Sequence, residues 1–136
     1  MKIVCSKSKL STAISIVLKA VSTKTTMPIL ECILIEAQGD IIKLTANDME
    51  LGIETILEGE VIEPGRIALE AKLLSDIVRK LADNNVTIET DDTYQTMIRC
   101  EKSKFKIAGK EGSDFTELPE IEKNDFITVK IKQNSI

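Results

Sequence analysis

The pattern of hydrophobic and polar positions changes period early in the chain. Residues 2–6 alternate as in a half-buried strand, and residues 6–22 then space their apolar side chains three and four apart, as in an amphipathic helix. The predicted apolar stripe of this helix is Leu10, Ile14, Val17, Leu18 and Val21. The opposite side carries only small or basic residues, namely Ser8, Ser11, Ser15, Lys19 and Ser22. The chain is therefore predicted to begin with a strand followed by a helix.

Three strand-like stretches follow in close succession. The first reads ILECILIEA and leads through Gly39-Asp40 to IIKLTA, after which Asn47-Asp48 leads to MELGIETILEGE. Turns this short predict antiparallel hairpins. In the third stretch Leu51, Ile53 and Leu57 share one face, and we expect the other, acidic face to meet water; it carries Glu50, Gly52, Glu54 and Glu58.

The same order of elements then occurs a second time. A turn at residues 63–65 precedes the short strand RIALE, and residues 71–83 have helical spacing. The apolar stripe of this second helix is Leu74, Ile77, Val78 and Leu81. Three more strands are predicted in NVTIET, YQTMIRCE and SKFKIAGK. Two β-α-βββ halves of this kind predict an α+β fold with an internal repeat.

The last stretch, FITVKIKQNSI, alternates sharply after an acidic connector that contains proline. Ile127, Val129 and Ile131 share one face of this predicted strand. Its pattern is similar to KIVCSKSKL at the start of the chain, which favours the opening strand of a further unit over a closing strand. We therefore divide the chain into a first domain at residues 1–120 and, at 121–136, a linker with the first strand of a second domain. In this chain we expect the apolar face of that strand to be poorly covered.

The composition is that of an ordinary soluble globular protein. The 136 residues are 43% hydrophobic and 29% charged. No apolar run is long enough to span a membrane, and the apolar run at the start of the chain is too short for a signal peptide. We therefore expect a cytoplasmic protein. The three cysteines are widely spaced in apolar or alternating surroundings, which indicates buried thiols and no zinc site.

The absence of histidine and the distribution of charge narrow the function. Without histidine the chain lacks the commonest general base and the commonest metal ligand. Only four aromatic residues are present, too few for a stacking platform that binds single-stranded nucleic acid. The net charge is −4, yet the first 30 residues contain five lysines and no acidic residue. An acidic protein can therefore still present one basic surface.

Two longer blocks carry a resemblance to a known family. The block TTMPILECILIEAQGDIIKLTANDMELGIETILEGEVIEPG, followed later by SDFTELP, resembles the first domain of the bacterial DNA polymerase III beta subunits, which are sliding clamps. Thr116 stands where the family usually has a proline. The resemblance covers residues 1–120 and continues into the strand that follows.

The resemblance implies a ring around duplex DNA. Chains of this family have three such domains, two chains join head to tail, the helices line the hole and the sheets form the outside. The resemblance also implies a processivity factor that catalyses no reaction and needs no cofactor or metal. Its implied partners are duplex DNA, a second clamp subunit, and the polymerase III alpha subunit and clamp loader, which bind through the other domains.

Individual positions match basic residues of the family that contact DNA. Lys24 lies in the loop after the first helix, and Lys72 and Arg79 lie on the second helix. The resemblance implies that these three side chains face the hole. Lysines and arginines of this kind are also common on any protein surface, and that reading stays open.

The strand SKFKIAG resembles the family's subunit seam. Phe105 and Ile107 share one face of it, and Lys102, Lys104 and Lys106 lie on the other; the seam residues that the resemblance implies are Phe105, Ile107, Lys102 and Lys104. In the family this strand lies at a sheet edge and joins the third domain of the partner chain. The alternative is that the two apolar residues belong to the core and the lysines protect an exposed edge.

Two other functions remain as alternatives. Asp48, Glu50 and Glu54 are oxygen ligands that a metal-dependent hydrolase could use, although the two glutamates fall on the solvent face of one strand. A small interaction module could instead capture peptides at an edge strand and bind no DNA. Binding that weakens steeply with salt indicates a clamp, and salt-insensitive peptide binding indicates the module.

Overall fold

The computed structural model describes residues 1–21, 31–47 and 52–112, and the backbone of residues 126–130. The predictions for Lys24, Asp48, Glu50, Leu51 and Ile131 therefore lie outside the described residues. Within these ranges no helix is long and apolar enough to cross a membrane.

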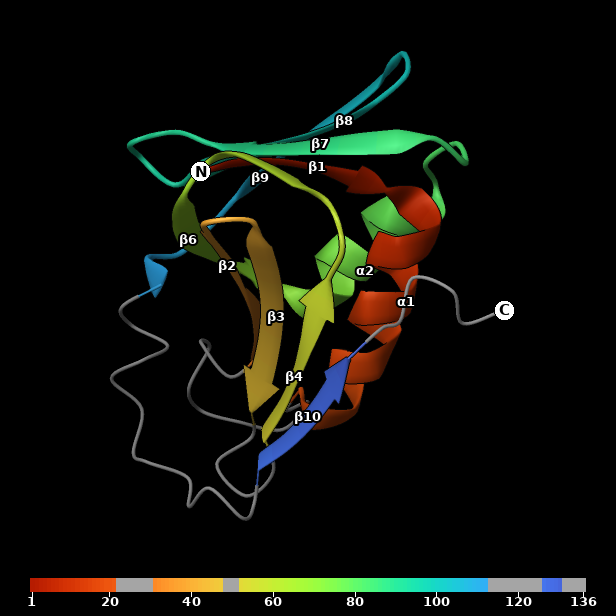
Figure 1. The fold of residues 1–136 in the computed structure, drawn as a ribbon. Helices are drawn as coiled ribbons and strands as arrows, with labels where there is room; N and C mark the ends of the chain where they lie inside the picture. Colours follow the sequence, from red (N-terminus) through yellow and green to blue (C-terminus); the bar gives the residue numbers. More distant parts are fainter. Residues whose placement is uncertain (22–30, 48–51, 113–125, 131–136) are drawn as a thin grey trace.

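Two five-stranded sheets make up most of the domain (Figure 1). Sheet A has the order β5-β1-β7-β8-β9, and sheet B has the order β10-β4-β3-β2-β6. The strands of sheet A are β5 (Glu60–Glu63), β1 (Lys2–Ser6), β7 (Asn85–Thr90), β8 (Gln95–Cys100) and β9 (Ser103–Ala108). Those of sheet B are β10 (Phe126–Lys130), β4 (Gly52–Leu57), β3 (Ile41–Asn47), β2 (Cys32–Gln38) and β6 (Gly65–Glu70).

Two helices lie side by side, and Figure 1 shows both on the same side of the domain. They are α1 (Lys7–Val17), continued by the short 3-10 helix η1 (Leu18–Ala20), and α2 (Ala71–Arg79). Helix α1 begins where the Ser6 hydroxyl accepts a hydrogen bond from the backbone N–H of Lys9 at 3.2 Å. The α+β fold with two helices and antiparallel sheets is confirmed, and β10 is a parallel addition at the edge of sheet B.

The buried faces of the helices agree with the predicted stripes over most of their length. All four predicted residues of the second stripe are buried, although α2 ends at Arg79 and not at residue 83, so Leu81 lies beyond the helix. In α1 the prediction holds as far as Val17, but Leu18 and Val21 are only partly buried and Ala20 is buried instead. The change to a 3-10 helix at Leu18 explains this difference, because three residues per turn rotate the later side chains to other faces.

The two halves exchange their first strands. β1 pairs with β7 of the second half, and β6 pairs with β2 of the first half, so each sheet contains strands from both. The stretch predicted as one strand at residues 49–60 is instead two, because the chain leaves sheet B after β4 and enters sheet A as β5. On the predicted acidic face, Glu54 and Glu58 are partly exposed but Gly52 is buried, so that prediction is only partly right.

Both halves end in a tight crossing to the other sheet. Glu60 pairs with Val4 in β1, and Lys110 forms the corresponding antiparallel bridge with Ala68 in β6. A glycine precedes each of these pairs. A Cβ at Gly59 would lie 2.6 Å from the Val4 carbonyl oxygen, and one at Gly109 would lie within 2.8 Å of Ile67 and of the Tyr94 carbonyl. The repeat is therefore visible in the contacts as well as in the order of elements.

A single apolar core lies between the sheets and the helices. Its largest fully buried side chains are Ile3, Leu10, Ile14, Ile33, Ile35, Ile42, Leu44, Leu57, Ile67, Leu69, Leu74 and Ile88. The three cysteines are buried, as predicted. Burial raises the pKa of the Cys5 thiol to about 12 and that of Cys32 to about 11, so both thiols stay protonated at neutral pH.

Thr55 places a hydroxyl in this core. Its side chain is 0% exposed, and within the described residues its oxygen has no hydrogen-bond partner. Thr55→Val keeps the shape and removes the unsatisfied group, so we expect the free energy of unfolding to rise by about 1–2 kcal/mol. Urea unfolding of the two proteins measures this difference. A loss of stability in Thr55→Val would show that the hydroxyl is satisfied in solution.

The strand predicted near the end of the chain is present over Phe126–Lys130. It pairs in parallel with β4, so that Phe126 lies opposite Gly52 and Lys130 opposite Ile56. In this chain the strand therefore extends sheet B of the first domain. The assignment of residues 121–136 to a second domain stays a prediction.

Candidate nucleic-acid interface and edge strand

The outward side of α1 is basic or neutral, and that of α2 carries Lys72 and Arg79 together with Asp76. Helix α1 contains no acidic residue, and its side away from the core carries small hydroxyl side chains and Lys19. Helix α2 exposes Lys72 and Arg79, which are seven residues apart and so lie two turns apart on one face. The structure thus brings two of the three predicted DNA contacts to one surface, while Lys24 lies outside the described residues.

Lys72 and Arg79 differ in their surroundings. Arg79 forms an ion pair with Asp76 one turn earlier, although the Arg79 side chain is still 68% exposed. Lys72 is exposed and forms no ion pair with any described residue. An exposed ion pair is weak and is screened by salt, so the Arg79 charge remains available to an anion. Lys72 is nevertheless the stronger candidate, because no described carboxylate forms an ion pair with it.

A groove of about 490 Å³ separates the end of α1 from α2. Lys72 and Arg79 line it together with three carboxylates, Glu31, Glu70 and Asp76. The remaining lining residues are Leu18, Val21, Ala71 and Ser75. With more carboxylates than cations the groove is a poor pocket for an anion. The two basic side chains are therefore suited to a partner that lies across the helices and not to a ligand inside the groove.

Cations without an ion pair fall into two places in the described part of the chain. Lys2, Lys9, Lys43, Arg79 and Arg99 each pair with a carboxylate. One group of the others lies on or next to the helices and consists of Lys7, Lys19, Lys72 and Lys80. A second group, Lys102, Lys104, Lys106 and Lys110, lies on β9 or beside it. Arg66 in β6 is the remaining one. The unpaired positive charge is thus concentrated on the helices and on β9.

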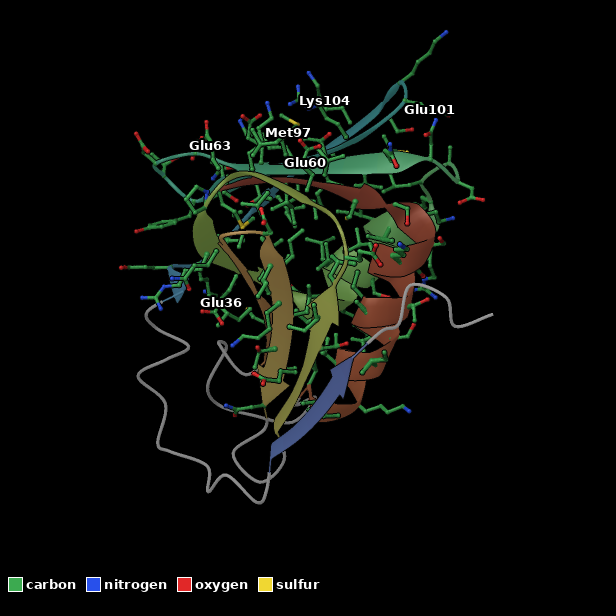
Figure 2. The ribbon with its side chains drawn as sticks, viewed as in Figure 1. Glu36, Glu60, Glu63, Met97, Glu101 and Lys104 are labelled. Atoms are coloured by element: carbon green, nitrogen blue, oxygen red, sulfur yellow. The ribbon has the colours of Figure 1, made fainter. Side chains whose placement is uncertain are left out.

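Carboxylates and cations occur together on the solvent faces of the sheets. Lys43 contacts Glu36 at 3.8 Å and Glu54 at 3.4 Å, across β2, β3 and β4. In Figure 2 the side chains of Glu60 and Glu63 lie at the top with sheet A, away from the helices. The prediction of basic or neutral helix faces holds for α1 but only in part for α2, which carries Asp76, and the strands carry cations as well as carboxylates.

Strand β9 forms one edge of sheet A. In the described structure it pairs only with β8, so its other side is open to a further strand. Phe105 is half-buried and Ile107 is 7% exposed, and both pack on the core. Lys102 and Lys104 are exposed, and Figure 2 shows Lys104 pointing away from the domain. Ile107 is thus a core residue, whereas Phe105 and the lysines are accessible at the edge.

Sequence reasoning did not select Lys106 as a site residue, although it belongs to the same row. It is exposed on β9 opposite Met97 of β8, on the same face as Lys104. The signal that identifies it is the alternation of lysine with apolar residues from Lys102 to Ile107.

The described residues offer no metal site for a hydrolase. They contain no group of three or more histidine, cysteine, aspartate or glutamate side chains that could hold an ion. Of the three proposed ligands, Glu54 pairs with Lys43, and Asp48 and Glu50 lie outside the described ranges. The hydrolase alternative therefore has no geometric support.

Comparison with known proteins agrees with this geometry. Residues 1–119 match the family model of the DNA polymerase III beta subunit, N-terminal domain. A beta sliding clamp of Synechocystis is 41% identical over 130 residues, covering 90% of this chain and 33% of the relative. A beta sliding clamp of Bacillus subtilis is 36% identical over 137 residues, covering 95% of this chain and 36% of the relative.

Solved structures show the same fold. A putative DNA polymerase III beta subunit from Eubacterium rectale superposes with a TM-score of 0.85 at 61% identity, covering 90% of this chain and 33% of that one. The sliding clamp of Bacillus subtilis gives 0.83 at 36% identity, covering 90% and 34%. The chain thus spans about a third of the length of the relatives that it matches. It belongs to the DNA polymerase III beta subunit family and has the fold of that family's N-terminal domain.

Proposed function

We propose that residues 1–120 are the first domain of a ring-shaped sliding clamp that encircles duplex DNA and tethers the replicative DNA polymerase. The protein is a processivity factor, catalyses no reaction and works in the cytoplasm. The observation that carries this proposal is the basic surface of the helices in a domain of this family. Lys7, Lys19 and Lys72 lie on or next to α1 and α2 without an ion pair among the described residues, and Asp76 is the one carboxylate that these two helices contain.

The helices suit contact with the DNA backbone and not with the bases. Lys72 and Arg79 point out from one helix, and Lys24 follows the other helix in the sequence. Long cationic side chains on a helix surface neutralise phosphates without reading sequence, so the protein can move along the duplex. Of Lys72 and Arg79, Lys72 should contribute more to DNA affinity, because the Asp76 carboxylate partly neutralises the Arg79 charge.

The partners follow from the same role. The ring is completed by two further domains and by a second subunit that joins head to tail. The polymerase III alpha subunit and the clamp loader bind through those further domains. Residues 121–136 are the linker and the opening strand of the second domain, and the backbone of Phe126–Lys130 is already extended as that role requires.

The internal repeat supports β9 as the subunit seam. Strand β4 of the first half corresponds to β9 of the second, because each ends in a glycine and a crossing to the other sheet. The outer edge of β4 accepts β10, whereas the outer edge of β9 has no strand among the described residues. A second subunit at that edge would pair with the β9 backbone and contact Phe105, Ile107, Lys102 and Lys104.

One observation favours a second candidate function. The open edge of β9 could capture an extended peptide by itself, as in domains that bind partners by strand addition. Such a module would bind no DNA. Binding of short duplexes that weakens steeply with salt supports the clamp, and peptide binding that is insensitive to salt supports the module.

Removal of the helix lysines tests the clamp directly. In a full-length clamp whose first domain has this sequence, Lys24→Ala with Lys72→Ala should lower the salt dependence of DNA binding. Each phosphate contact contributes about 0.9 to the slope of log affinity against log salt, so the double variant should lose about 1.8. Fluorescence anisotropy with a labelled duplex at several salt concentrations measures this slope.

The matched control removes two lysines elsewhere. Lys43→Ala with Lys110→Ala makes the same charge change on the strands, and we expect it to leave the slope unchanged. An equal loss in both variants would mean that net charge and not the helix surface governs DNA binding. No loss in either would remove Lys24 and Lys72 from the interface.

A further inference from the structure

Asn84 joins three segments of the domain through hydrogen bonds. Its carbonyl oxygen accepts from the N–H of Lys7, the first residue of α1, at 3.0 Å. Its own N–H donates to the Ala82 carbonyl at 2.9 Å, and its side-chain Oδ1 accepts from the Asn85 N–H at 2.8 Å. Its Nδ2 donates to Oε1 of Glu101 at 3.2 Å. Asn84 therefore connects the loop between α2 and β7, in which it lies, with the start of α1 and with the β8–β9 turn.

Glu101 occupies a position where glycine or asparagine is expected. It is the first of two residues between Cys100 and Ser103, which form the last pair of the β8–β9 hairpin. Its φ is +52°, in the left-handed region. Two-residue hairpin turns of this kind favour glycine there, and a glutamate is strained. Because this strained glutamate accepts a hydrogen bond from Asn84, we infer that its side chain has a structural or functional role.

The Asn84–Glu101 bond ties the hairpin to the helices. The two residues are 17 positions apart, and the bond runs from the loop after α2 to the tip of the β8–β9 hairpin. A weaker contact lies beside it, because the Cys100 thiol reaches the Ala82 carbonyl at 3.4 Å. Figure 1 shows the end of this hairpin projecting beyond the rest of the domain, and Figure 2 labels Glu101 there. The hairpin is also held by the pairing of β8 with β7 and by the core contacts of Cys100, Phe105 and Ile107.

We propose that Asn84 and Glu101 are positioning residues for β9: their hydrogen bond holds the hairpin at the angle to the helices that presents the β9 edge to a partner strand. The inference rests on the proposed function, in which β9 is the subunit seam. The reason is preorganisation, since a hairpin that is already held loses less conformational freedom when the partner binds. The bond cannot stabilise the dimer by more than the free energy of the bond itself.

The test measures assembly and stability in the same variants. In a full-length clamp whose first domain has this sequence, Asn84→Ala and Glu101→Gly should each raise the dissociation constant of the dimer about three- to ten-fold, the range of one hydrogen bond. Analytical ultracentrifugation at several concentrations measures it. The double variant should lose no more than either single one, because both remove the same bond.

Two readouts separate positioning from a role in folding alone. Glu101→Gly relieves the strained φ, so its melting temperature should be unchanged or higher even while the dimer weakens. Glu101→Gln keeps an oxygen that can accept from Asn84 and should restore the dimer to within about two-fold of the unchanged protein. A Glu101→Gly variant that melts lower and dimerises normally would overturn the proposal.

Phe105→Ala distinguishes failure of this inference from failure of the seam. If Phe105→Ala leaves the dimer intact, β9 is not the subunit seam, and that part of the proposed function is wrong. If Phe105→Ala weakens the dimer while Asn84→Ala and Glu101→Gly do not, the seam stands and the positioning role is overturned.

Discussion

Gly59→Val is expected to lower the free energy of unfolding by about 3 kcal/mol, the upper range for overpacking a tight site. Gly59 lies where the chain crosses from β4 to β5. A Cβ there would lie 2.6 Å from the Val4 carbonyl oxygen and 3.0 Å from Cys5 Cβ and Ile42 Cδ1. Because one of these atoms belongs to the backbone of a central strand, the crossing has to move and the β1–β5 pairing weakens.

The melting temperature is the simplest measure of this effect. For a domain of this size, 3 kcal/mol corresponds to a fall of roughly 10 °C. Gly39→Ala is the matched control, because nothing lies within 4 Å of its Cβ and only the strain of its φ of +60° is added. We expect the control to cost about 1 kcal/mol. Equal effects at the two positions would show that the crossing is looser than the structure indicates.

Reversing the charge of the β9 edge is expected to disrupt the assembled ring. In a full-length clamp whose first domain has this sequence, Lys102→Glu, Lys104→Glu and Phe105→Ala together should raise the dimer dissociation constant at least about 100-fold, or 2.7 kcal/mol. The change removes the accessible aromatic side chain and reverses two exposed charges. The domain should stay folded, because neither lysine has an ion pair among the described residues.

The control for this variant makes the same charge change on the helices. Lys19→Glu with Lys80→Glu lies on exposed positions next to α1 and α2, and it should leave the dimer intact. Sedimentation of both proteins, with a melting curve for each, separates dissociation from unfolding. A dimer that survives the β9 variant would place the seam elsewhere.

The chain of 136 residues by itself should be mostly monomeric and should bind duplex DNA weakly. It presents one β9 edge and few phosphate contacts, and it cannot enclose the duplex alone. Light scattering and anisotropy test both statements. A stable oligomer of ring size, or tight sequence-selective binding, would contradict the proposed function.

The elements themselves could be predicted from local spacing. The second helix begins at Ala71 as expected, and all four predicted stripe residues are buried, because a helical period needs only residues three and four apart. The hairpins were predictable from their short turns. The first helix ended earlier than expected, since the change to a 3-10 turn at Leu18 leaves no signal in the apolar spacing.

The candidate site was predicted only in part. Lys72, Lys102 and Lys104 are exposed as expected, because charged residues on the polar face of an element avoid burial. The Arg79–Asp76 ion pair could have been expected from the spacing of the two residues in the helix, because side chains three positions apart are neighbours there. The role of Asn84 could not be predicted, since its contacts join segments that are far apart in the sequence.

The sequence by itself determined which segments are helices and strands, which faces are apolar, and that the order of elements repeats. Only the tertiary structure decided that the halves exchange β1 and β6, that the stretch after Asn47 divides between two sheets, and that β9 is left at an edge. The physical reason is one of range. The periodicity of a segment depends only on which of its own residues face the core. Strand pairing depends on backbone hydrogen bonds between distant segments, and the sequence of one strand says little about which strand will be its partner.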